Sequence, residues 1–465
     1  MQAEELKGKR VTIMGLGLHG GGVGTTLFLH GVGAKIIVTD IKTKEDLQVS
    51  LEKLKELKNI EYVFGQHRPE DFTNADLVVK SPPVPWSNKY IKMALDKKIP
   101  VETDSSLFFK LCRNPIVGIT GTKGKTTTAT LVYEILKAAG KDVIQVGIGQ
   151  VSVLNKLSHL KKESLVVFEL SSWRLAALGR NKISPQISVI TNIYPDHLNY
   201  YGTMDKYILD KKYIFLNQKN TDFCILNWDD PNLNILESEI KSQLIKFSEK
   251  SIKNGKSVYL ADGIIYWNNG VDEKKIMEVS EITMRGSHNV VNILAAISAT
   301  KALGIEYKYI RDTIKNFKGI PHRLELVREL NGVKYINDTA ATTPESAIAG
   351  IRAFSEPVIL IAGGTDKKLD VPELAKIIAE KVKGVVFLKG NATDKIIVEL
   401  KKIFPDKKDE DFKIVESMEK ALEFAKSVAE TGDVILLSPG AASFGLFANE
   451  FDRGNKFKEA VNNLK

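Results

Sequence analysis

The sequence predicts an α/β fold in three domains, and three observations support this. The chain has 465 residues, more than one core can use when domains usually have ~100–200 residues. Short apolar runs ending in Gly, Asp, Ser or Thr alternate with helical patterns, as in doubly wound parallel sheets. A Gly-rich phosphate loop follows one of these runs. We expect a Rossmann-like domain at 1–113, a central sheet like those of P-loop ATPases at 114–318, and a Rossmann-like domain at 319–465.

The composition is that of a globular protein with a moderate positive charge. The 66 Lys and Arg residues against 57 Asp and Glu give a net charge of +9, which suits small anionic substrates. No basic block carries interleaved aromatics, so we expect no nucleic-acid partner. Cys112 and Cys224 lie far apart, which indicates neither a disulfide framework nor a thiolate metal site. No run suits a signal peptide or a membrane helix, so we expect a cytoplasmic protein without membrane insertion.

A dinucleotide-type fingerprint opens the first segment. Gly15, Gly17 and Gly20 follow the run "RVTIM", and the next run, "KIIVT", leads into Asp40. This pattern rests a diphosphate on a helix N-terminus and places an acid on a hydroxyl-rich sugar, so UDP satisfies it as well as NAD does. A nicotinamide oxidoreductase is therefore an alternative, although the second segment offers no hydride-transfer residue. The stretch "KSPPVPWSN", residues 80–88, predicts a rigid loop at a sheet edge.

The stretch "IVGITGTKGKTTTAT" predicts a strand, a phosphate loop and a helix. Gly121 and Gly124 let backbone N–H groups surround an anion, and the helix adds the positive end of its dipole. Lys125 can reach the outer phosphates, and the Thr126 hydroxyl can bind Mg²⁺. We expect the phosphates of ATP to be bound by Gly121, Thr122, Lys123, Gly124, Lys125, Thr126 and Thr127.

Polar residues follow two further apolar runs of the second segment. Glu169 ends "LVVFE", and Asn192, Asp196 and His197 follow "SVIT". Because the carboxyl ends of parallel strands share one edge of a sheet, these residues should lie near the phosphate loop. A buried carboxylate there is unfavourable without a cation, so we expect Glu169 to bind Mg²⁺. Taken alone, His197 is a histidine satisfied by loop hydrogen bonds.

The third segment repeats the doubly wound pattern. Its runs "VKYIN", "PVILIAGG", "GVVFLKG" and "DVILLSPG" end in turn residues. Asp338, Thr342, Lys367 and Ser443 follow such runs, so they should form a polar rim that suits an anion at one edge of the sheet.

Six stretches resemble the Mur ligase family, the ATP-dependent, amide-forming enzymes of peptidoglycan synthesis. They are "FELSSWRL", "PDHLNYYGTMDKYILDKK", "SHNVVNILAA", "GIPHRLELV", "NDTAATTP" and "LSPGAASFGLFANEFDRG". The resemblance covers nearly the whole chain and implies that the three domains bind a UDP-sugar, ATP and an amino acid, in chain order. It implies a cytoplasmic ligase, which we expect to be a monomer, that adds D-glutamate to UDP-N-acetylmuramoyl-L-alanine through an acyl phosphate.

The resemblance also implies roles for individual residues. It assigns the UDP-sugar to Gly17, Leu18, His19, Asp40, Ser81 and Ser171. It adds to the ATP contacts Asn292, Arg323 and Asp338. It assigns two Mg²⁺ ions to Thr126, Glu169, His197 and Lys211, of which the last three, with Lys125, would be catalytic. It assigns the amino acid to Thr342, Lys367, Ser443 and Phe444.

One lysine has a role that only the resemblance implies. The family uses a carbamylated lysine four residues after a Tyr, and here Tyr207 points to Lys211, with Lys212 as the alternative. A bare ammonium repels Mg²⁺, whereas a carbamate is an anionic oxygen ligand. His197 is the candidate general base.

Some residues depart from the pattern of the family, and other functions compete with it. An Asn that relatives place on the muramoyl group is absent from "GIGQVSVL", where Gln150 or Ser152 would substitute. Ala340 and Gly445 replace a lysine and an acid near the amino-acid pocket. A folate polyglutamate ligase is a rival that the first segment disfavours, and a non-enzymatic nucleotide-dependent scaffold is disfavoured by the intact catalytic residues. We expect hinges near Asn114 and Lys318.

Overall fold

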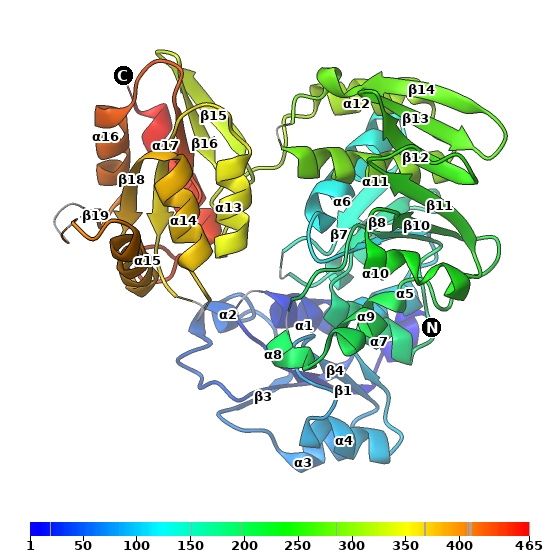
Figure 1. The fold of residues 1–465 in the computed structure, drawn as a ribbon. Helices are drawn as coiled ribbons and strands as arrows, with labels where there is room; N and C mark the ends of the chain where they lie inside the picture. The colour runs from blue at the N-terminus through cyan, green and yellow to red at the C-terminus, as the bar shows by residue number, and fades with distance from the viewer. Residues whose placement is uncertain are drawn as a thin grey trace. The chain divides into compact units, whose positions relative to one another are not determined.

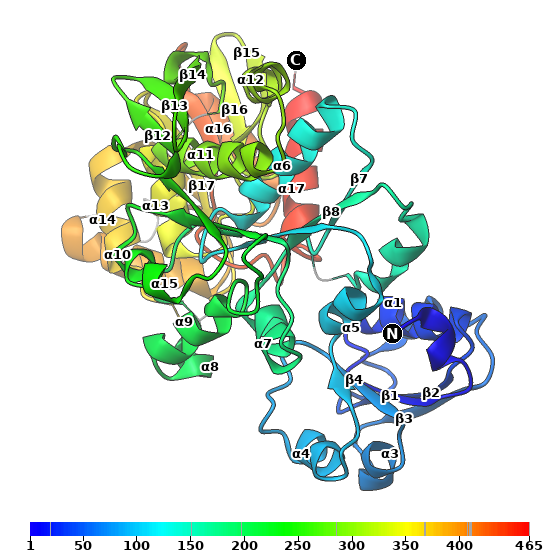
Figure 2. The ribbon, with the colours of Figure 1, turned by 90° about the vertical axis from the view of Figure 1, so that its right-hand side faces the viewer.

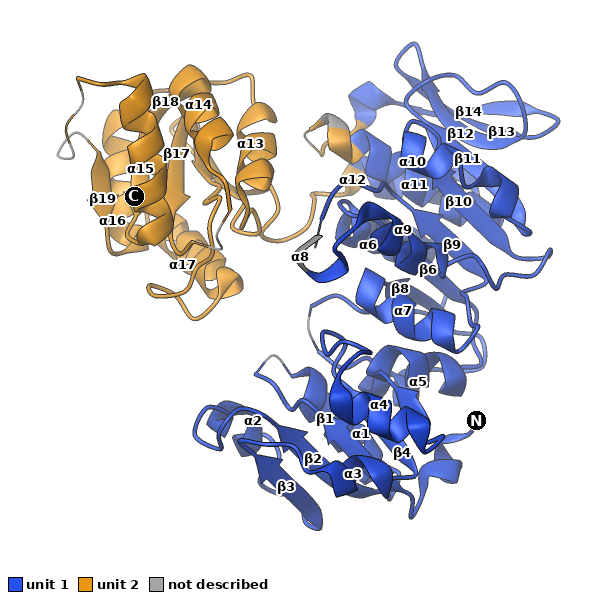
Figure 3. Cartoon of the chain, turned by 60° about the horizontal axis from the view of Figure 1, so that its bottom comes forward, with its two compact units in different colours: residues 1–281, 290–315 blue, residues 282–289, 316–465 orange. Residues whose placement is uncertain are grey.

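The computed structural model describes residues 1–18, 20–149, 151–196, 198–284, 286–366, 369–406, 408 and 412–464. Over these residues the strands form three sheets, one in each predicted segment, and helices separate most of the strands (Figure 1). The predicted α/β class is confirmed. The chain divides into two compact units, residues 1–281 with 290–315 and residues 282–289 with 316–465 (Figure 3). No helix in the described ranges is long and apolar enough to cross a membrane.

The first sheet of unit 1 is parallel, with the order β3-β2-β1-β4-β5 over the described residues. Its strands are β1 (Arg10–Met14), β2 (Lys35–Asp40), β3 (Ile60–Phe64), β4 (Leu77–Lys80) and β5 (Val101–Glu102). The strand order reverses at β1, which has β2 on one side and β4 on the other. In open α/β sheets ligands bind at such a switch point, outside the carboxyl ends of the strands.

The second sheet has the order β14-β13-β12-β11-β10-β9-β6-β8-β7 in the described part of the chain. Its strands are β6 (Ile116–Thr120), β7 (Val143–Val146), β8 (Leu165–Glu169), β9 (Ile187–Ile190), β10 (Phe223–Asn227), β11 (Gln243–Ser248), β12 (Lys256–Ala261), β13 (Ile264–Asn269) and β14 (Glu273–Glu278). Strands β6 to β12 run parallel, whereas β13 and β14 form an antiparallel extension that the sequence did not predict. Here the switch point is β6, between β8 and β9.

The helices around these two sheets begin at caps that the sequence supplies. Thr103, for example, caps α5 with its hydroxyl, and Asn88 caps α4 with its amide oxygen. The helices are α1 (Gly21–Gly31), α2 (Gln48–Glu52), α3 (Pro69–Thr73), α4 (Lys89–Asp96), α5 (Asp104–Leu111), α6 (Lys125–Ala138), α7 (Ser172–Arg180), α8 (Leu198–Tyr201), α9 (Met204–Lys212), α10 (Pro231–Asn234), α11 (Ser287–Ala302) and α12 (Tyr307–Asn316). Short 3₁₀ helices lie at Ala3–Leu6, Leu154–His159, Glu237–Glu239 and Val279–Glu281.

One apolar core joins the first two sheets. Helix α5 lies between them in both views (Figures 1 and 2), and its Phe108 and Phe109 each lie 5.5 Å from the ring of Phe168 on β8. Buried aromatic pairs of this kind add to the free energy of burial and fix the packing. The core explains why contacts merge these two segments into one unit, and why Asn114 lies inside that unit while Lys318 lies near its boundary.

Unit 2 contains the third sheet, with the order β15-β16-β20-β17-β18-β19 over the residues described. Its strands are β15 (Glu325–Leu330), β16 (Val333–Asn337), β17 (Val358–Gly363), β18 (Val382–Leu388), β19 (Lys413–Val415) and β20 (Val434–Leu437). Its helices are α13 (Pro344–Arg352), α14 (Pro372–Lys381), α15 (Asn391–Ile403), α16 (Met418–Val428) and α17 (Glu450–Asn462). All pairs are parallel except β15 with β16, so β16 and β20 end at the same edge.

Candidate active site

The phosphate loop joins β6 to α6 and has two positions that require glycine. Gly121 has φ +151° and Gly124 has φ +84°. A Cβ at Gly121 would lie 1.9 Å from Oγ1 of Thr191, and one at Gly124 would lie 2.1 Å from Oδ1 of Asn292. The backbone conformation and the lack of space therefore both exclude a side chain at these positions.

Residues after β9 brace the loop. The carbonyl of Asn192 accepts a hydrogen bond from Thr122 N at 2.9 Å, and its side-chain oxygen accepts one from Lys123 N at 2.8 Å. The Thr191 hydroxyl donates to the carbonyl of Lys123 at 2.6 Å. The loop is thus held in shape by its neighbours, a preorganisation that suits the binding of a phosphate chain.

The side chain of Lys125 folds back onto this loop. Its Nζ donates to the carbonyls of Gly121 at 2.8 Å and Thr122 at 2.9 Å. Lys125 is also the first residue of α6, whose N-terminus carries a partial positive charge. A cationic side chain and a helix N-terminus therefore meet at one point, which is an anion-binding arrangement.

Glu169 ends β8, the strand beside β6. The register places it level with Ile119, two residues before Gly121. Its Oε2 is buried and has no hydrogen-bond partner among the residues that the structure describes. A carboxylate oxygen in this state is unfavourable unless a cation binds it, so the residue fits a Mg²⁺ ligand.

The predicted Mg²⁺ ligands are of mixed type. The described residues contain no group of three or more His, Cys, Asp or Glu side chains that could hold a metal. The prediction does not need one, because Thr126, Glu169, a modified Lys211 and the phosphates of a nucleotide would share the coordination. The orphaned oxygen of Glu169 beside the loop fits that donor set.

The packing of helix α9 distinguishes Lys211 from Lys212, the two candidates for the carbamylated lysine. Lys211 is only 1% exposed, and burial, with a smaller effect from Lys125, holds its pKa well below the usual value. Lys212 lies nearer the surface and pairs with Glu239, to which its Nζ donates at 2.6 Å. The hydroxyls of Tyr207 and Thr122 lie 3.1 Å apart, which ties α9 to the phosphate loop one turn before Lys211.

The N-terminal turn after β1 is held by the acid at the end of β2. Asp40 accepts hydrogen bonds from Gly17 N and Lys42 N, each at 3.0 Å. Leu18 is exposed, and Ser81 lies beside the turn, where its N donates to the carbonyl of Met14 at 2.8 Å. Asp40 therefore shapes the turn, and a carboxylate keeps further lone pairs for a ligand hydroxyl.

Two serines near the junction have structural partners. Ser171 caps α7, and its hydroxyl accepts a bond from Arg174 N at 3.4 Å. The hydroxyl of Ser152 is buried, lies 3.2 Å from that of Thr25 and accepts a bond from Leu154 N at 3.3 Å. A helix cap and a junction contact account for the two hydroxyls, so their role toward a substrate stays a prediction.

In unit 2 a buried acid directly follows β16 of the third sheet. Asp338 accepts bonds from Ser438 Oγ at 2.8 Å and Leu324 N at 3.2 Å. Burial raises its pKa to about 7 despite these bonds and the nearby cation of Arg323. Arg323 itself is exposed.

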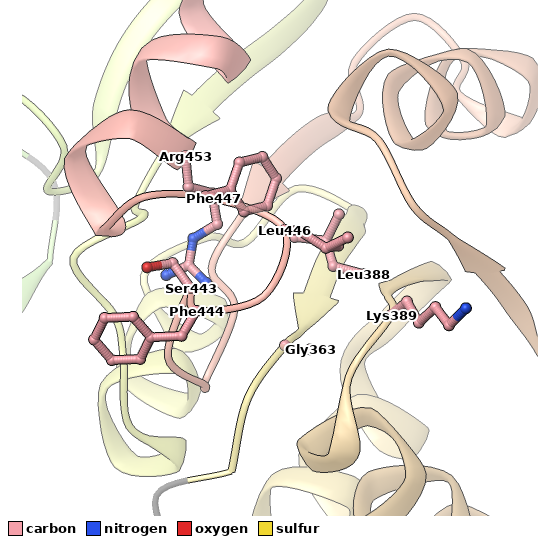
Figure 4. Close-up of a pocket in the computed structure, with 9 residues that line it drawn as sticks. Gly363, Leu388, Lys389, Ser443, Phe444, Leu446, Phe447 and Arg453 are labelled. Carbon is pink, nitrogen blue, oxygen red and sulfur yellow. The ribbon is translucent and has the colours of Figure 1, made fainter. Parts of the chain in front are cut away.

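A pocket follows β20 in unit 2, and Figure 4 shows its lining. The Ser443 hydroxyl is buried and has no hydrogen-bond partner in the described part of the chain, while Phe444 is 56% exposed. Lys389 extends away from the other labelled side chains (Figure 4). A buried hydroxyl without a partner is available for a polar ligand.

The guanidinium of Arg453 on α17 holds the loops of this pocket. It is fully buried and donates to the hydroxyl and carbonyl of Thr339, at 2.9 and 3.0 Å, and to the carbonyl of Ala441 at 3.2 Å. Burial lowers its pKa to about 10. Arg453 therefore ties the loop after β16 to the loop after β20.

Three family models match the chain, one in each segment. They are described as "Mur ligase MurD-like, N-terminal domain" at residues 9–103, "Mur ligase middle domain" at 119–300 and "Mur ligase, glutamate ligase domain" at 322–440. A protein of Roseiflexus sp. (strain RS-1) named UDP-N-acetylmuramoylalanine--D-glutamate ligase is 40% identical over 98% of this chain and 99% of its own length. This chain belongs to the Mur ligase family.

Other relatives agree with that assignment. A protein of the same name from Clostridioides difficile (strain 630) is 38% identical over 99% of this chain and all of its own length. The crystal structure of UDP-N-acetylmuramate-alanine ligase MurC from Thermotoga maritima aligns over 98% of this chain and 100% of that one, with TM-score 0.59 and 20% identity. The likeness to the MurC structure shows that the chain has the fold of a Mur ligase.

The structure brings together only some of the residues that the resemblance to Mur ligases assigned. The phosphate loop, Glu169, Lys211 and Asn292 lie in unit 1, whereas Arg323, Asp338, Thr342, Ser443 and Phe444 lie in unit 2. That the two groups meet on one nucleotide stays a prediction. Four of the residues named from the sequence lie outside the described residues: His19, Gln150, His197 and Lys367.

Sequence reasoning missed several residues that shape the Mur ligase site. Thr191 and Asn192 brace the phosphate loop, and Asn192 was noted only as a polar residue after a strand. Arg453 lies in the quoted stretch "FANEFDRG", but nothing in the pattern marks it as buried. The available signal was position, because residues just after parallel strands lie at the ligand edge of a sheet.

Proposed function

We propose that this Mur ligase is an ATP-dependent enzyme that adds D-glutamate to UDP-N-acetylmuramoyl-L-alanine in cytoplasmic peptidoglycan precursor synthesis. The supporting observation is a phosphate loop that contains Lys125 and lies level with the unpartnered, buried oxygen of Glu169. The near full-length similarity to ligases of that name supports the choice of substrates.

ATP binds at the phosphate loop in this proposal. The loop from Gly121 to Thr127 and the N-terminus of α6 hold the β and γ phosphates, while the N–H groups of Thr122 and Lys123 stay bonded to Asn192 and fix the shape of the loop. Lys125 neutralises charge on the transferring group. Asn292, whose side chain borders Gly124, contacts the nucleotide from α11. Arg323 and Asp338 reach it from unit 2.

Mg²⁺ at this site would screen the repulsion between the substrate carboxylate and ATP and would stabilise charge on the transferring phosphoryl group. The residues proposed to hold two such ions are Thr126, Glu169, His197 and a carbamylated Lys211. Glu169 presents an oxygen without a partner for this purpose, and Thr126 lies in the first turn of α6.

The carbamate forms on Lys211 rather than on Lys212. CO₂ adds to the uncharged amine, an N–C bond forms, one proton leaves the nitrogen, and the product carries one negative charge. Burial favours the uncharged amine of Lys211, whereas the amine of Lys212 is engaged with the carboxylate of Glu239.

Amide formation then follows from an activated carboxyl group. The terminal carboxylate of the UDP-sugar attacks the γ phosphorus of ATP, ADP leaves, and an acyl phosphate results. The amine of D-glutamate attacks the acyl carbon, and the C–O bond to phosphate breaks. The amine must lose a proton, for which His197 is the candidate acceptor.

The two substrates bind at opposite ends of the chain in this proposal. Gly17, Leu18, His19 and Asp40 contact uridine diphosphate, with Ser81 and Ser171 nearby. Thr342, Lys367, Ser443 and Phe444 bind the amino acid. The buried Ser443 hydroxyl, which lacks a partner, supports that assignment.

The test is phosphate release by the purified protein with ATP, Mg²⁺, UDP-N-acetylmuramoyl-L-alanine and one amino acid at a time. We expect release with D-glutamate only when all components are present, and none from Lys125→Ala. Release without the UDP-sugar would remove the assignment. Release with L-lysine but not D-glutamate would change the acceptor, and glutamate addition to a folate substrate would favour the polyglutamate ligase.

A further inference from the structure

Lys80, the last residue of β4, is a buried lysine that the proposed mechanism does not use. It is only 1% exposed and forms no ion pair with any described residue. Burying an ammonium group without a carboxylate is unfavourable by several kcal/mol in general. A lysine at such a position needs a reason beyond packing.

Among the described residues, the hydrogen-bond and ring partners of the Lys80 ammonium lie in the loop that follows it. We call residues 81–88 the proline loop. Lys80 Nζ donates to the carbonyl of Val84 at 2.8 Å and of Pro82 at 3.3 Å, and it lies 4.6 Å from the centre of the Trp86 ring. One buried side chain therefore fixes three consecutive parts of the loop.

Besides Lys80, the proline loop is held by the packing of Val84 and Trp86 against the apolar cluster around β4 and by a small set of backbone hydrogen bonds. Pro82, Pro83 and Pro85 have no N–H to donate. Within the loop, Val84 N donates to Ser81 O and Asn88 N to Pro85 O, each at 3.0 Å. Most of its residues are half-buried or exposed, so their carbonyls can turn to water if the ammonium is removed.

A second cation also lies against the tryptophan of this loop. The guanidinium of Arg180, at the end of α7, lies 4.3 Å from the centre of the Trp86 ring. Helix α7 follows β8 of the second sheet, while the loop follows β4 of the first. Lys80 and Arg180 thus hold one tryptophan from two different segments of unit 1.

The proline loop begins at the switch point of the first sheet. Ser81 N donates to Met14 O at 2.8 Å, and a Cβ on Gly15 would lie 2.9 Å from the Cβ of Ser81. The loop therefore forms a wall against the Gly-rich turn where the proposed function places uridine diphosphate.

We propose that Lys80 is a positioning residue that holds the proline loop as a preformed wall of the sugar-nucleotide site, with Arg180 as the second fastening. The identity of the ligand rests on the proposed function. A preformed wall avoids the entropy of ordering a loop when the ligand binds.

The electrostatic surroundings agree with this role. The charged groups that face Lys80 are Arg180 on α7, Asp104 on α5 and Asp210 on α9. Burial, with a smaller effect from Arg180, lowers the pKa of Lys80 to about 7, whereas Asp104 and Asp210 act to raise it. An uncharged amine still has two N–H groups to donate, so Lys80 can hold the carbonyls of Pro82 and Val84 both below and above pH 7.

The test compares Lys80→Met, Arg180→Met and the control Lys92→Met, an exposed lysine on α4. Methionine keeps an unbranched apolar side chain, one atom shorter than that of lysine, and removes the cation and the donors. We expect the KM for the UDP-sugar to rise roughly tenfold in Lys80→Met and less in Arg180→Met, because the loop is no longer preformed. The kcat and the KM for ATP should stay within about twofold, and Lys92→Met should match the wild type.

A calorimetric titration with UDP alone gives a readout independent of turnover. Weaker UDP binding by Lys80→Met, with an undiminished melting temperature, supports the proposal, since a merely structural role would lower stability instead. Unchanged UDP affinity and KM overturn it. If Lys80→Met does not fold, Arg180→Met decides by the same measurements. If the wild type binds UDP but shows no ligase activity, and Lys80→Met binds UDP more weakly, the proposed function is wrong while the role of Lys80 stands.

Discussion

Lys80 and Lys211 are two buried lysines of the same unit, and their surroundings differ. Each is only 1% exposed, and burial lowers the pKa of both amines. Lys80 donates to two carbonyls of one loop, whereas Lys211 lies on α9, one turn after the tyrosine that contacts the phosphate loop. In our proposals equal burial serves an anchor at Lys80 and a reactive amine at Lys211, and the neighbouring groups account for the difference.

The largest expected effect on activity comes from replacing Lys211. Lys211→Ala should lower kcat by ~10²-fold or more, because it removes a group proposed to stabilise charge at the transferring phosphate. Lys212→Ala, the matched control next to it, should keep most activity because it loses only an ion pair near the surface. Steady-state phosphate release measures both, and equal losses would contradict the assignment of Lys211.

Removal of CO₂ should have the next largest effect. Wild-type activity should fall in CO₂-free buffer and return with bicarbonate, because carbamate formation on an amine is reversible. The Lys80→Met variant should respond in the same way, and Lys211→Ala should not respond. A carbamate carbon signal in NMR spectra with ¹³C-bicarbonate, absent from Lys211→Ala, would locate the group. Activity insensitive to CO₂ argues against the modification.

Lys80 should contribute to the pH dependence of the free energy of unfolding. Its pKa is about 7 in the folded protein and 10.5 when unfolded, so the unfolded chain binds an extra proton between these values. Raising the pH through that window therefore stabilises the folded state, by about 2 kcal/mol between pH 7 and pH 9. Lys80→Met should lack this part of the gain. Thermal melts at several pH values measure it, with Lys92→Met as the control, and parallel curves for wild type and Lys80→Met contradict it.

The smallest effect concerns Ser443, a buried polar group in unit 2 that has no partner in the structure. If its hydroxyl bonds the amino acid, Ser443→Ala should raise the KM for D-glutamate about fivefold, the value of one ordinary hydrogen bond. The KM for ATP and for the UDP-sugar should not change. An unaltered KM for D-glutamate would show that the hydroxyl does not contact it.

The sequence predicted the parts of the site that have a fixed spacing. The phosphate loop was clear because Gly121, Gly124 and Lys125 occur together after an apolar run, and the structure shows the physical reason for both glycines. Glu169 was predicted from its place at a strand end. In contrast, Lys211 and Lys212 are adjacent on a helix, and only packing tells which one faces inward.

Other features depend on contacts that no local pattern encodes. Lys80 is the last residue of an apolar strand, where a lysine ordinarily marks the exposed end, yet the fold covers it with the proline loop. Ser171 was assigned to substrate, and the structure shows it also capping a helix. Strands β13 and β14 were missed because an antiparallel hairpin at the sheet edge adds no motif and lies far from the phosphate loop.

The walls behind Gly121 and Gly124 have a consequence for inhibitors. Thr191 and Asn292 fill the space that any larger residue would need. A compound that binds the backbone of this loop would therefore contact a surface whose shape point mutations at these glycines can hardly change. Resistance to such a compound should arise elsewhere, through altered expression or uptake, more readily than through change in the loop itself.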